Sequence, residues 1–557
     1  MRWWQLVLIA AAAFTVPPGC QSNKNPSCSL VGGTPLSVLA PWPSYRADTA
    51  NSGRTPNDVD LTRTTGKGSL LFDRYCSGSI SQACTDNTEC LTAATPGPIN
   101  TGQTCLVPKH CSVTTTQPCT GDGNCPQNEF CAVPIGPISA APIIGPPSAN
   151  GEPSIYLGST DGNVYVLNPV LGVGTIAQNM RVPGAILGSP LLGADNTLFV
   201  GGNAQLVRFE TDGLQMNLAV LTGIVSASPN IWEDGTVYVA TQSGLFNGVC
   251  PNGIHRFSPL LLAPSQSTAA VVQDPNVDPN TEMTSIEIVG SLGGQVRAFN
   301  IRGRTYWSFF ASASVVSAVV VDEDTNIFYV ADTSGRVFAG QVANGQPVPG
   351  FGFQTNAGAS ITASPALGRS NAAPKLSKLY VADEGRRHCS DTTAQLCNMD
   401  ADCPTGEACL VAAGTLYALD RATGAVCWTF EADGPINSSP AVATGGDHDV
   451  VVFGADVDEI LDPVVGPVAT GGRVYAVPDR ADDRCDGSPR CDGESHCPLW
   501  VFNPGFSIGT ASPSIGDPDS RTVYIGRAGS RRGVGSECPT AAPCVVNEGG
   551  AVYIIEP

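Results

Sequence analysis

The sequence predicts an all-β fold, an eight-bladed β-propeller of four-stranded blades closed by the N-terminal strand and carrying small disulfide-rich insertions. Three observations lead to this prediction. A strand-rich unit repeats eight times with a minimum period of about 40 residues, which is typical of propeller blades. Abundant Gly (62) and Pro (45) provide many turns, and no run beyond the N-terminus shows helical periodicity. The last unit stops after three strands, and residues 69–75 offer the missing fourth strand.

Each unit opens on a strand of small residues and continues with strands rich in β-branched and aromatic residues. Small side chains suit an innermost strand, because bulky ones would collide around a narrow channel, whereas larger side chains pack between blades. A seven-bladed ring is the main alternative, since the fourth unit is weak. An open solenoid is less favoured, because closure leaves no strand edge for aggregation. The opening strands are residues 138–145, 186–193, 225–232, 267–274, 315–322, 361–368, 436–443 and 509–516.

The best-preserved unit contains residues 414–430, GTLYALDRATGAVCWTF, which form a strand, a polar turn and a second strand. The turn matches AxDxxTGxxxW, the tryptophan-docking motif of PQQ-like propellers, so the chain resembles the PQQ-like (quinoprotein-type) β-propeller repeat family. Residues 298–307 look like a shortened copy, and residues 42–53 are similar to the segment that precedes the first blade in such proteins. The motif residues are Ala418, Asp420, Thr423, Gly424 and Trp428.

The resemblance covers most of residues 40–557 and implies that Trp428 packs over the peptide plane of a neighbouring blade's motif. It also implies a fold shared by quinoprotein alcohol dehydrogenases and by the outer-membrane-assembly scaffold lipoprotein, and a fold alone does not choose between these functions. The dehydrogenases use a calcium-bound quinone, a catalytic Asp and often two adjacent cysteines. This sequence has no Cys-Cys dipeptide, no set of calcium ligands that can be aligned, and no CxxCH haem motif. We therefore expect no catalytic residue and no cofactor, and a closer likeness to the scaffold lipoprotein.

Acidic loops provide weak calcium candidates, because Ca²⁺ is a hard cation that prefers oxygen ligands. The best group is Asp456, Asp458 and Glu459. Its spacing does not match an EF-hand loop, and a solvated acidic loop is the favoured interpretation. The sequence therefore predicts no metal site.

The N-terminus has the pattern of an export signal over residues 1–19, with Arg2, an apolar run and then small residues. The run is too short to span a bilayer as a mature helix. Cys20 follows Gly19 and is a candidate for lipoprotein acylation, with ordinary signal cleavage nearby as the alternative. Residues 20–39 are expected to form a tether and residues 40–557 the propeller. The formal charge of −20 argues against nucleic acid or anionic lipid as a partner.

The 21 cysteines of an exported chain are expected to form disulfides. Residues 76–131 hold two small cysteine modules and residues 388–410 a third, all sharing the spacing Cys-x7-Cys-x5-Cys. Four cysteines allow three connectivities, which the spacing does not resolve. His110 and His388 precede the first cysteine of two modules, but paired CxxC spacing is absent, so disulfides are favoured over zinc. The module cysteines are Cys76, Cys84, Cys90, Cys105, Cys111, Cys119, Cys125, Cys131, Cys389, Cys397, Cys403 and Cys409.

Blade geometry predicts where the insertions lie, because inter-blade loops and second-to-third-strand loops emerge on the same face. That face should carry all three modules and the insertions at residues 245–253, 457–472 and 528–550. The insertion at 480–497 should lie on the opposite face, near Cys427. The predicted pairings are Cys427 with Cys485, Cys491 or Cys497, then Cys538 with Cys544, and Cys28 with Cys250 as a guess.

The leading hypothesis is a non-catalytic scaffold of the bacterial cell envelope, in the periplasm or at the outer membrane or cell surface. Its inserted loops would bind envelope or extracellular proteins, because loops on a rigid scaffold are the usual place for binding. The chain is expected to be a monomer that meets the membrane only through a lipid anchor. A PQQ- and Ca²⁺-dependent quinoprotein oxidoreductase and a surface carbohydrate-binding or adhesive protein are the two alternatives.

Overall fold

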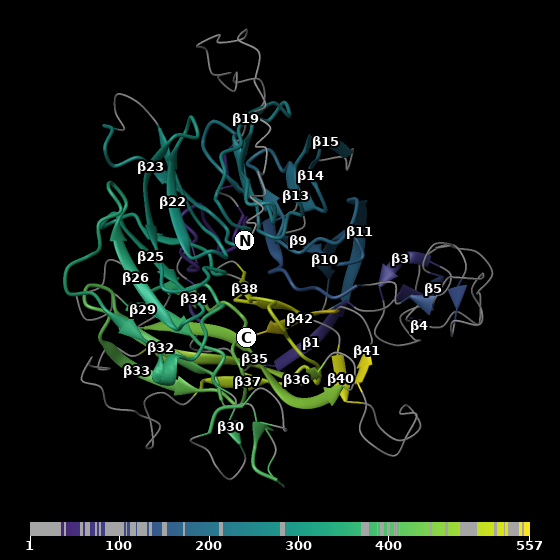
Figure 1. The fold of residues 1–557 in the computed structure, drawn as a ribbon. Coiled ribbons are helices and arrows are strands. Elements are labelled where there is room, and N and C mark those ends of the chain that lie inside the picture. The colour runs from purple at the N-terminus through teal and green to yellow at the C-terminus, as the bar shows by residue number, and fades with distance from the viewer. Residues whose placement is uncertain are drawn as a thin grey trace, which may run out of the picture.

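The computed structural model consists of eight four-stranded antiparallel sheets arranged as the blades of a ring (Figure 1). Its described residues are 35–37, 40–55, 59–61, 136–147, 153–170, 173–210, 215–278, 284–368, 378–386, 413–444, 448–462, 466–479, 498–516, 521–527 and 551–556, with short strands and turns within 67–132, 388–410 and 530–547. No helix in this part of the chain is long and apolar enough to cross a membrane.

The first four blades follow the chain without interruption, each from its innermost to its outermost strand. Blade 4 begins on the degenerate repeat at 267–274, so the weak fourth unit is a complete blade. The strands are β8 (Ile143–Pro147), β9 (Pro153–Gly158), β10 (Asn163–Val170) and β11 (Val173–Arg181) in blade 1; β12 (Leu191–Leu192), β13 (Leu198–Gly202), β14 (Gln205–Phe209) and β15 (Gln215–Val220) in blade 2; β16 (Asn230–Ile231), β17 (Val237–Ala240), β18 (Phe246–Val249) and β19 (His255–Phe257) in blade 3; and β20 (Ala270–Gln273), β21 (Ser285–Gly290), β22 (Gln295–Asn300) and β23 (Thr305–Phe310) in blade 4.

The last four blades complete the ring, and β38 of blade 8 lies beside β8 of blade 1. The eight-bladed prediction is therefore confirmed, and the seven-bladed alternative was wrong. The strands are β24 (Val320–Asp322), β25 (Ile327–Ala331), β26 (Arg336–Gln341) and β27 (Phe353–Gln354) in blade 5; β28 (Ala366–Leu367), β29 (Lys378–Ala382), β32 (Thr415–Asp420) and β33 (Val426–Glu431) in blade 6; β34 (Ala441–Ala443), β35 (Asp449–Asp462), β36 (Gly466–Asp479) and β37 (Trp500–Phe502) in blade 7; and β38 (Ser514–Ile515), β39 (Val523–Arg527), β42 (Ala551–Glu556) and β1 (Lys67–Phe72) in blade 8.

The N-terminal strand closes the ring, as the sequence predicts. β1 pairs antiparallel with β42, from Lys67 opposite Glu556 to Phe72 opposite Val552. The strand begins and ends earlier than the predicted 69–75, because β2 (Tyr75–Cys76) belongs to the sheet of the first cysteine module. Joining the two ends of the chain in one blade removes the open edge of the last sheet.

Two predicted insertions are not loops. In blade 3, Phe246–Val249 is the third strand itself, and the stretch at 253–258 provides the fourth strand instead of the third. The sequence misled here because Asn247 and Gly248, residues that are depleted in strands, stand in the middle of this short strand. In blade 7, residues 457–472 extend the hairpin of β35 and β36, which stay paired out to Asp462 opposite Gly466.

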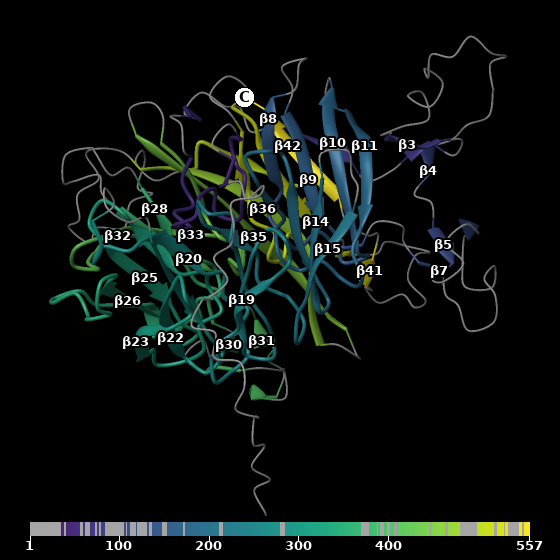
Figure 2. The ribbon, with the colours of Figure 1, turned by 90° about the horizontal axis from the view of Figure 1, so that it is seen from above.

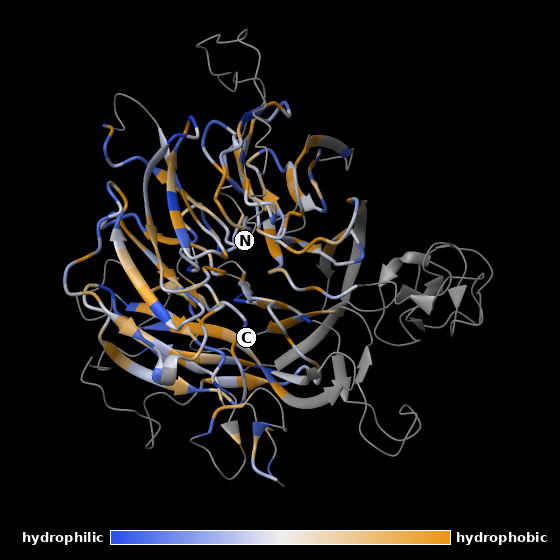
Figure 3. Cartoon of the chain, in the orientation of Figure 1, coloured by the Kyte–Doolittle hydropathy of each residue, from blue (hydrophilic) through white to orange (hydrophobic). Residues whose placement is uncertain are grey.

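Apolar residues gather along the strands of the blades, and the hydrophobic clusters lie between neighbouring blades (Figure 3). Between blades 5 and 6, for example, Tyr329 and Val320 pack with Leu379 and Tyr417. Each blade thus contributes one surface to each of two interfaces, so the stability of one blade depends on its neighbours.

Trp307 shows how a blade docks on the next one. Its indole Nε1 donates a hydrogen bond of 2.8 Å to the Val342 carbonyl in the turn after β26. The ring also lies over Gly345 (φ +70°), where an added Cβ would come within 2.6 Å of the indole. The shortened motif copy of blade 4 therefore performs the docking that the resemblance implies.

The docking contact predicts a difference between two glycines of the same turn. Gly345→Ala should destabilise the protein by about 1–3 kcal/mol more than Gly350→Ala, because both need a positive φ but only Gly345 meets an aromatic ring. Urea unfolding of the two variants measures the difference. Equal losses of stability would show that Trp307 is not packed against Gly345.

A second prediction concerns Glu287 on β21, which is fully buried beside Ser285 and Tyr238. Burial raises the pKa of Glu287 from 4.5 to about 8, while Arg256 and Asp234 act in opposite directions. The folded chain thus holds a proton that the unfolded chain releases between these two pKa values, so stability should fall as pH rises through this window.

The Glu287→Gln variant cannot ionise at this position, so its stability relative to the wild type should increase from pH 5 to pH 8, by up to about 1.4 kcal/mol per pH unit. Urea unfolding at four pH values tests this. Glu233→Gln, on an exposed turn of blade 3, controls for the loss of one carboxylate. A stability difference between the wild type and Glu287→Gln that stays constant with pH would contradict the prediction.

Candidate functional site

Residues 40–55, named here the plug segment, close one end of the central channel. The backbone carbonyls of the plug segment accept hydrogen bonds from the innermost strands of seven blades. Six of these blades donate a backbone N–H, and blade 3 donates the side-chain amide of Asn230. These bonds join Trp42 O to Ile144 N (2.9 Å), Pro43 O to Leu192 N (2.9 Å), Thr49 O to Asn230 Nδ2 (2.9 Å) and Val271 N (2.8 Å), Ala50 O to Val321 N (2.9 Å), Ser52 O to Leu367 N (2.8 Å), and Gly53 O to Val442 N (2.8 Å). The plug segment therefore satisfies backbone donors that would otherwise be buried without partners.

The plug segment has an unusual backbone, because Arg46, Ala47 and Asn51 have φ values of 64°, 73° and 56°. Left-handed conformations are costly for residues with a Cβ and persist where the surroundings enforce them. Arg46 supplies part of that enforcement. Its guanidinium is buried, donates to the carbonyls of Pro365 (2.7 Å) and Pro440, and lies against Gly53. Burial lowers the pKa of Arg46 to about 10, which leaves it charged at neutral pH.

Above the plug segment, the channel contains a cavity of about 330 Å³. All eight blades contribute to its wall, and Tyr45 of the plug segment forms its floor. None of the described lining residues is acidic, basic or a cysteine. The lining consists of Tyr45, Ser139, Ala140, Leu187, Gly188, Ser189, Ser226, Ser228, Gln242, Gln266, Thr268, Val316, Ala318, Thr362, Ser364, Asn437, Ser439 and Thr510.

A belt of hydroxyl groups joins the blades around this cavity. In five neighbouring pairs of blades, a backbone N–H donates to the hydroxyl of the equivalent residue in the next blade. The donors and acceptors are Ser189 N to Ser228 Oγ (2.9 Å), Ser228 N to Thr268 Oγ1 (3.2 Å), Ala318 N to Ser364 Oγ (2.9 Å), Ser364 N to Ser439 Oγ (2.9 Å), and Ser439 N to Ser512 Oγ (3.0 Å).

The hydroxyl belt explains why the repeated position is Ser: the side chain is small, and its hydroxyl also accepts a hydrogen bond from the neighbouring blade. Sequence reasoning explained why the position is small but missed why it is polar. The sequence did contain a signal for this hydrogen bonding, since six of the eight repeats carry Ser or Thr at this position. The plug function of residues 42–53 was missed as well, because nothing local in that segment shows which strands it will meet.

The floor of the cavity is fixed by Tyr45, whose hydroxyl bonds to Ser364 Oγ (3.0 Å) and Ser439 Oγ (2.9 Å). Behind the wall, Thr362 donates a hydrogen bond to Glu384. Burial is the main cause that raises the pKa of Glu384, and the charge of Asp383 raises it further. Glu384 thus contacts the lining through Thr362 without belonging to it.

The lining does not fit the quinone cofactor and calcium that the dehydrogenase resemblance implies. Calcium needs several oxygen ligands, normally including carboxylates, and an anionic quinone needs cationic partners. The described lining supplies neither. No catalytic step is therefore assigned to such a group.

The docking motif of blade 6 forms a hydrogen-bonded turn. Asp420 Oδ1 accepts hydrogen bonds from Ala422 N (3.0 Å), Thr423 N (2.8 Å) and Thr423 Oγ1 (2.8 Å). Gly424 has φ +73° and an added Cβ there would lie 2.8 Å from the Gly352 carbonyl of blade 5, while Ala418 is buried in the core. These residues hold blades together and lie away from the cavity lining.

Trp428 makes its polar contact with a carboxylate of the next blade. Its indole Nε1 donates a hydrogen bond of 2.9 Å to the Asp479 carboxylate of blade 7, which also accepts from Lys378 and Tyr380. All four side chains are fully buried. Trp428 therefore donates its hydrogen bond to a side chain, whereas Trp307 donates to a backbone carbonyl.

Among the weak calcium candidates, the structure describes the side chain of Asp456 only. Its Oδ1 accepts hydrogen bonds from Ile508 N (2.8 Å) and Gly509 N (3.0 Å). Asp332 and Asp383, at the matching ends of second strands, also accept bonds from backbone N–H groups. The Asp456 carboxylate thus fixes the loop that leads into blade 8. The side chains of Asp458 and Glu459 lie outside the described residues.

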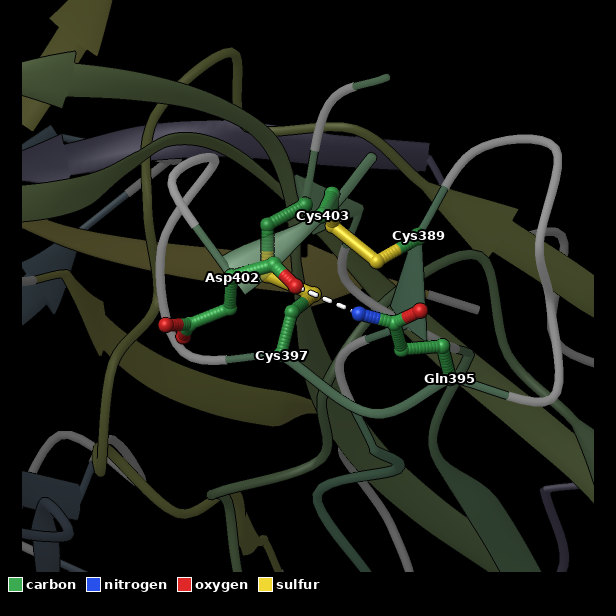
Figure 4. Close-up of a disulfide and its surroundings, with 6 residues drawn as sticks. Cys389, Gln395, Cys397, Asp402 and Cys403 are labelled. Atoms are coloured by element: carbon green, nitrogen blue, oxygen red, sulfur yellow. Dashed lines mark hydrogen bonds between the residues drawn. A yellow bond between two sulfur atoms is a disulfide. The ribbon is translucent and has the colours of Figure 1, made fainter. Parts of the chain in front are cut away.

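The third cysteine module contains two disulfides, Cys389–Cys403 and Cys397–Cys409 (Figure 4). The sequence left three connectivities open, and the structure selects this one. The side-chain amide of Gln395 donates to the Asp402 carbonyl between the two disulfides. The sulfur atoms of Cys389, Cys397 and Cys403 lie within 4.8 Å of one another, but each is in a disulfide, so none is a thiolate ligand for zinc.

The first two modules lie at the outer rim of the ring, beyond β11 (Figure 1 and Figure 2). β3 (Ser79–Ala83) of the first module is beside β11. The expectation that all modules crowd the face of the channel mouth was wrong for these two. The reason is that their connection leaves β1, which is the outermost strand of blade 8 and is farthest from the channel.

Two further cysteines of the described blades are oxidised. Both Cys427 and Cys250 form disulfides, and Cys427 is fully buried. Their partners are outside the described residues, as are Cys28, Cys84, Cys90, Cys125, Cys485, Cys491, Cys497, Cys538 and Cys544. The predicted pairings of these cysteines, like the acylation of Cys20, therefore stay predictions.

Comparisons with known proteins add little to this site. No protein-family model matches the chain, and no curated protein matches it. Among solved structures, the computationally designed Ika8 protein is 14% identical, with a TM-score of 0.46, over 76% of this chain and 97% of that chain. BamB from Moraxella catarrhalis is 14% identical, with a TM-score of 0.43, over 75% of this chain and 96% of that chain. The fold and site define an eight-bladed β-propeller with a plugged channel.

The three cysteine modules should share one connectivity. In each, the first and fourth cysteines face each other across two paired strands: Cys76 with Cys105, Cys111 with Cys131, and Cys389 with Cys409. We expect Cys76–Cys90, Cys84–Cys105, Cys111–Cys125 and Cys119–Cys131, by analogy with the third module. Mass spectrometry of a non-reduced digest tests this, with the third module as internal control. Any first-to-second or first-to-fourth pairing would contradict the prediction.

Proposed function

We propose that this chain is an exported, non-catalytic binding and scaffold protein of the cell envelope that engages other proteins through the face carrying the channel mouth and the third cysteine module. The main support for a non-catalytic role is the neutral lining of the cavity. A catalytic channel needs a positioned base, nucleophile or metal, and the described lining has only hydroxyl, amide and apolar groups.

The geometry of the plug segment supports an orientation for such a scaffold. Ser37 and Leu36 bond at the ends of β12 on the plugged side. If Cys20 carries the lipid anchor, the 15 residues from Cys20 to Pro35 span at most about 50 Å. The plugged end would then face the membrane and the channel mouth would face away, free for a partner.

The third module offers a rigid apolar contact on the proposed face. Leu396 is 47% exposed between the two disulfides of that module. Disulfide-bonded loops are ordered before binding, so less conformational entropy is lost when a partner docks. An exposed apolar side chain on an ordered loop is a common centre for protein recognition.

Cross-linking and affinity purification from intact envelopes test the scaffold role. The protein should recover specific envelope proteins, Leu396→Asp should lose most of them, and Val501→Asp should retain them. Val501 is a matched control because it is 44% exposed on an outer strand of blade 7. Recovery of no partner, or equal recovery with both variants, would refute the proposed face.

The oxidoreductase alternative is tested by adding PQQ and Ca²⁺ to the purified protein and measuring dye reduction with alcohols and sugars. We expect no turnover above a control without protein. Sustained dye reduction would overturn the non-catalytic assignment.

The lipid anchor has its own test. Cys20→Ser should move the protein from the membrane fraction to the soluble fraction and abolish labelling by a fatty-acid analogue. Unchanged fractionation would show that ordinary signal cleavage produces the mature chain.

A further inference from the structure

The cavity above the plug segment is shaped for a compact occupant. The plug segment closes its inner end, so a ligand enters from the mouth and stops at Tyr45. A volume of about 330 Å³ lies at the lower end of the range for small-molecule sites. This shape suits one ring or one chain end and excludes a chain that threads through the propeller.

The chemistry of the lining selects an uncharged polar ligand. Thirteen of the eighteen lining residues carry a hydroxyl or a carboxamide, and none carries a charge. Hydroxyl and amide groups both donate and accept hydrogen bonds, so they match ligand hydroxyls in either role. A charged ligand would lose its hydration here without gaining a counter-charge.

Several of these polar groups lack a protein partner. Ser189 is 1% exposed, lines the cavity, and its Oγ has no hydrogen-bond partner in the described structure. Ser226 Oγ is likewise buried without a partner. The side chains of Gln242 and Gln266 line the mouth and make no hydrogen bond within the described part of the chain. The two glutamine carboxamides are thus available to a ligand at the mouth, whereas the two serine oxygens are enclosed by protein atoms.

Apolar contacts are also present at the right places for a sugar. The Tyr45 ring is held at the floor by the bonds of its hydroxyl to two serines. Leu187 and Val316 lie at the mouth, and Leu187 is 36% exposed. A pyranose ring presents hydroxyls at its edge and C–H groups on its faces, so it can use both the polar wall and these apolar surfaces.

We propose that the channel mouth binds a neutral sugar residue, either a free saccharide or the end of a glycan chain, inserted toward Tyr45. This inference goes beyond the proposed function, because a sugar site inside the channel and a protein-docking face outside it are separate. Binding involves no covalent step. The hydroxyl belt joins five neighbouring pairs of blades around the cavity, so much of the site is formed before the ligand arrives.

Ligand-observed saturation-transfer NMR with the purified full chain tests the proposal. The panel contains neutral hexoses and N-acetylhexosamines, their neutral oligosaccharides, the corresponding uronic acids, and uncharged hexapeptides. Transfer to at least one neutral sugar is expected, with none to uronic acids. A signal from monosaccharides points to a free sugar, and a signal from oligosaccharides alone points to a glycan end.

Variants at the mouth locate the binding. Gln242→Leu and Gln266→Leu should each weaken affinity for the bound sugar about tenfold, equivalent to about 1.4 kcal/mol. Gln346→Leu, on an exposed turn of blade 5 away from the cavity, should leave affinity unchanged. All three sites are at least partly exposed, so the variants should fold, and circular dichroism checks this.

The proposal is overturned if no neutral sugar receives transfer, if uronic acids or peptides bind instead, or if the mouth variants bind like Gln346→Leu. None of these outcomes changes the result expected from cross-linking in intact envelopes. A failed sugar site and a failed scaffold role are therefore distinguishable.

Discussion

The fold depends on the hydrogen bonding of eight strands that converge on one channel. Side chains there must be small, and backbone groups facing the channel still need partners. The hydroxyl belt meets part of this need by joining five neighbouring pairs of blades, as between Ser364 and Ser439. The plug segment meets another part, and it tolerates left-handed backbone at Arg46 and Asn51 to do so. Size and hydrogen bonding together explain why Ser recurs in the opening strands.

The outer contacts between blades vary more than the inner ones. Trp307 docks on a backbone carbonyl, whereas Trp428 shares the buried Asp479 with Lys378 and Tyr380. Buried ion pairs contribute little net stability but penalise wrong arrangements, because an unpaired buried charge is costly. Arg421 and Asp322 form a similar buried pair between blades 6 and 5. These polar joints lie beside the most complete docking motif and fix the register of blades 5 to 7.

The function proposed for this chain follows from how charge is distributed around the channel. The acidic residues near the mouth are used for structure: Asp383 and Asp456 accept bonds from backbone N–H groups. The cavity itself is left neutral and rich in hydroxyls. A neutral cavity with a closed floor suits recognition of an uncharged ligand. The third cysteine module, held by two disulfides, adds an ordered surface to the same face.

The sequence by itself determined the propeller class, the closing strand and the docking turn, because these depend on local periodicity and on motifs such as Asp420 to Trp428. It favoured eight blades, and the structure excluded the alternative of seven. It also indicated disulfide modules from spacing alone. Only the tertiary structure decided the rest. The pairing of Cys389 with Cys403, the place of the first two modules at the rim, and the closing of the channel by the plug segment all depend on which distant residues meet. The neutral cavity belongs to this second group, since its lining comes from a few residues in each of eight blades, and no local pattern shows that they converge.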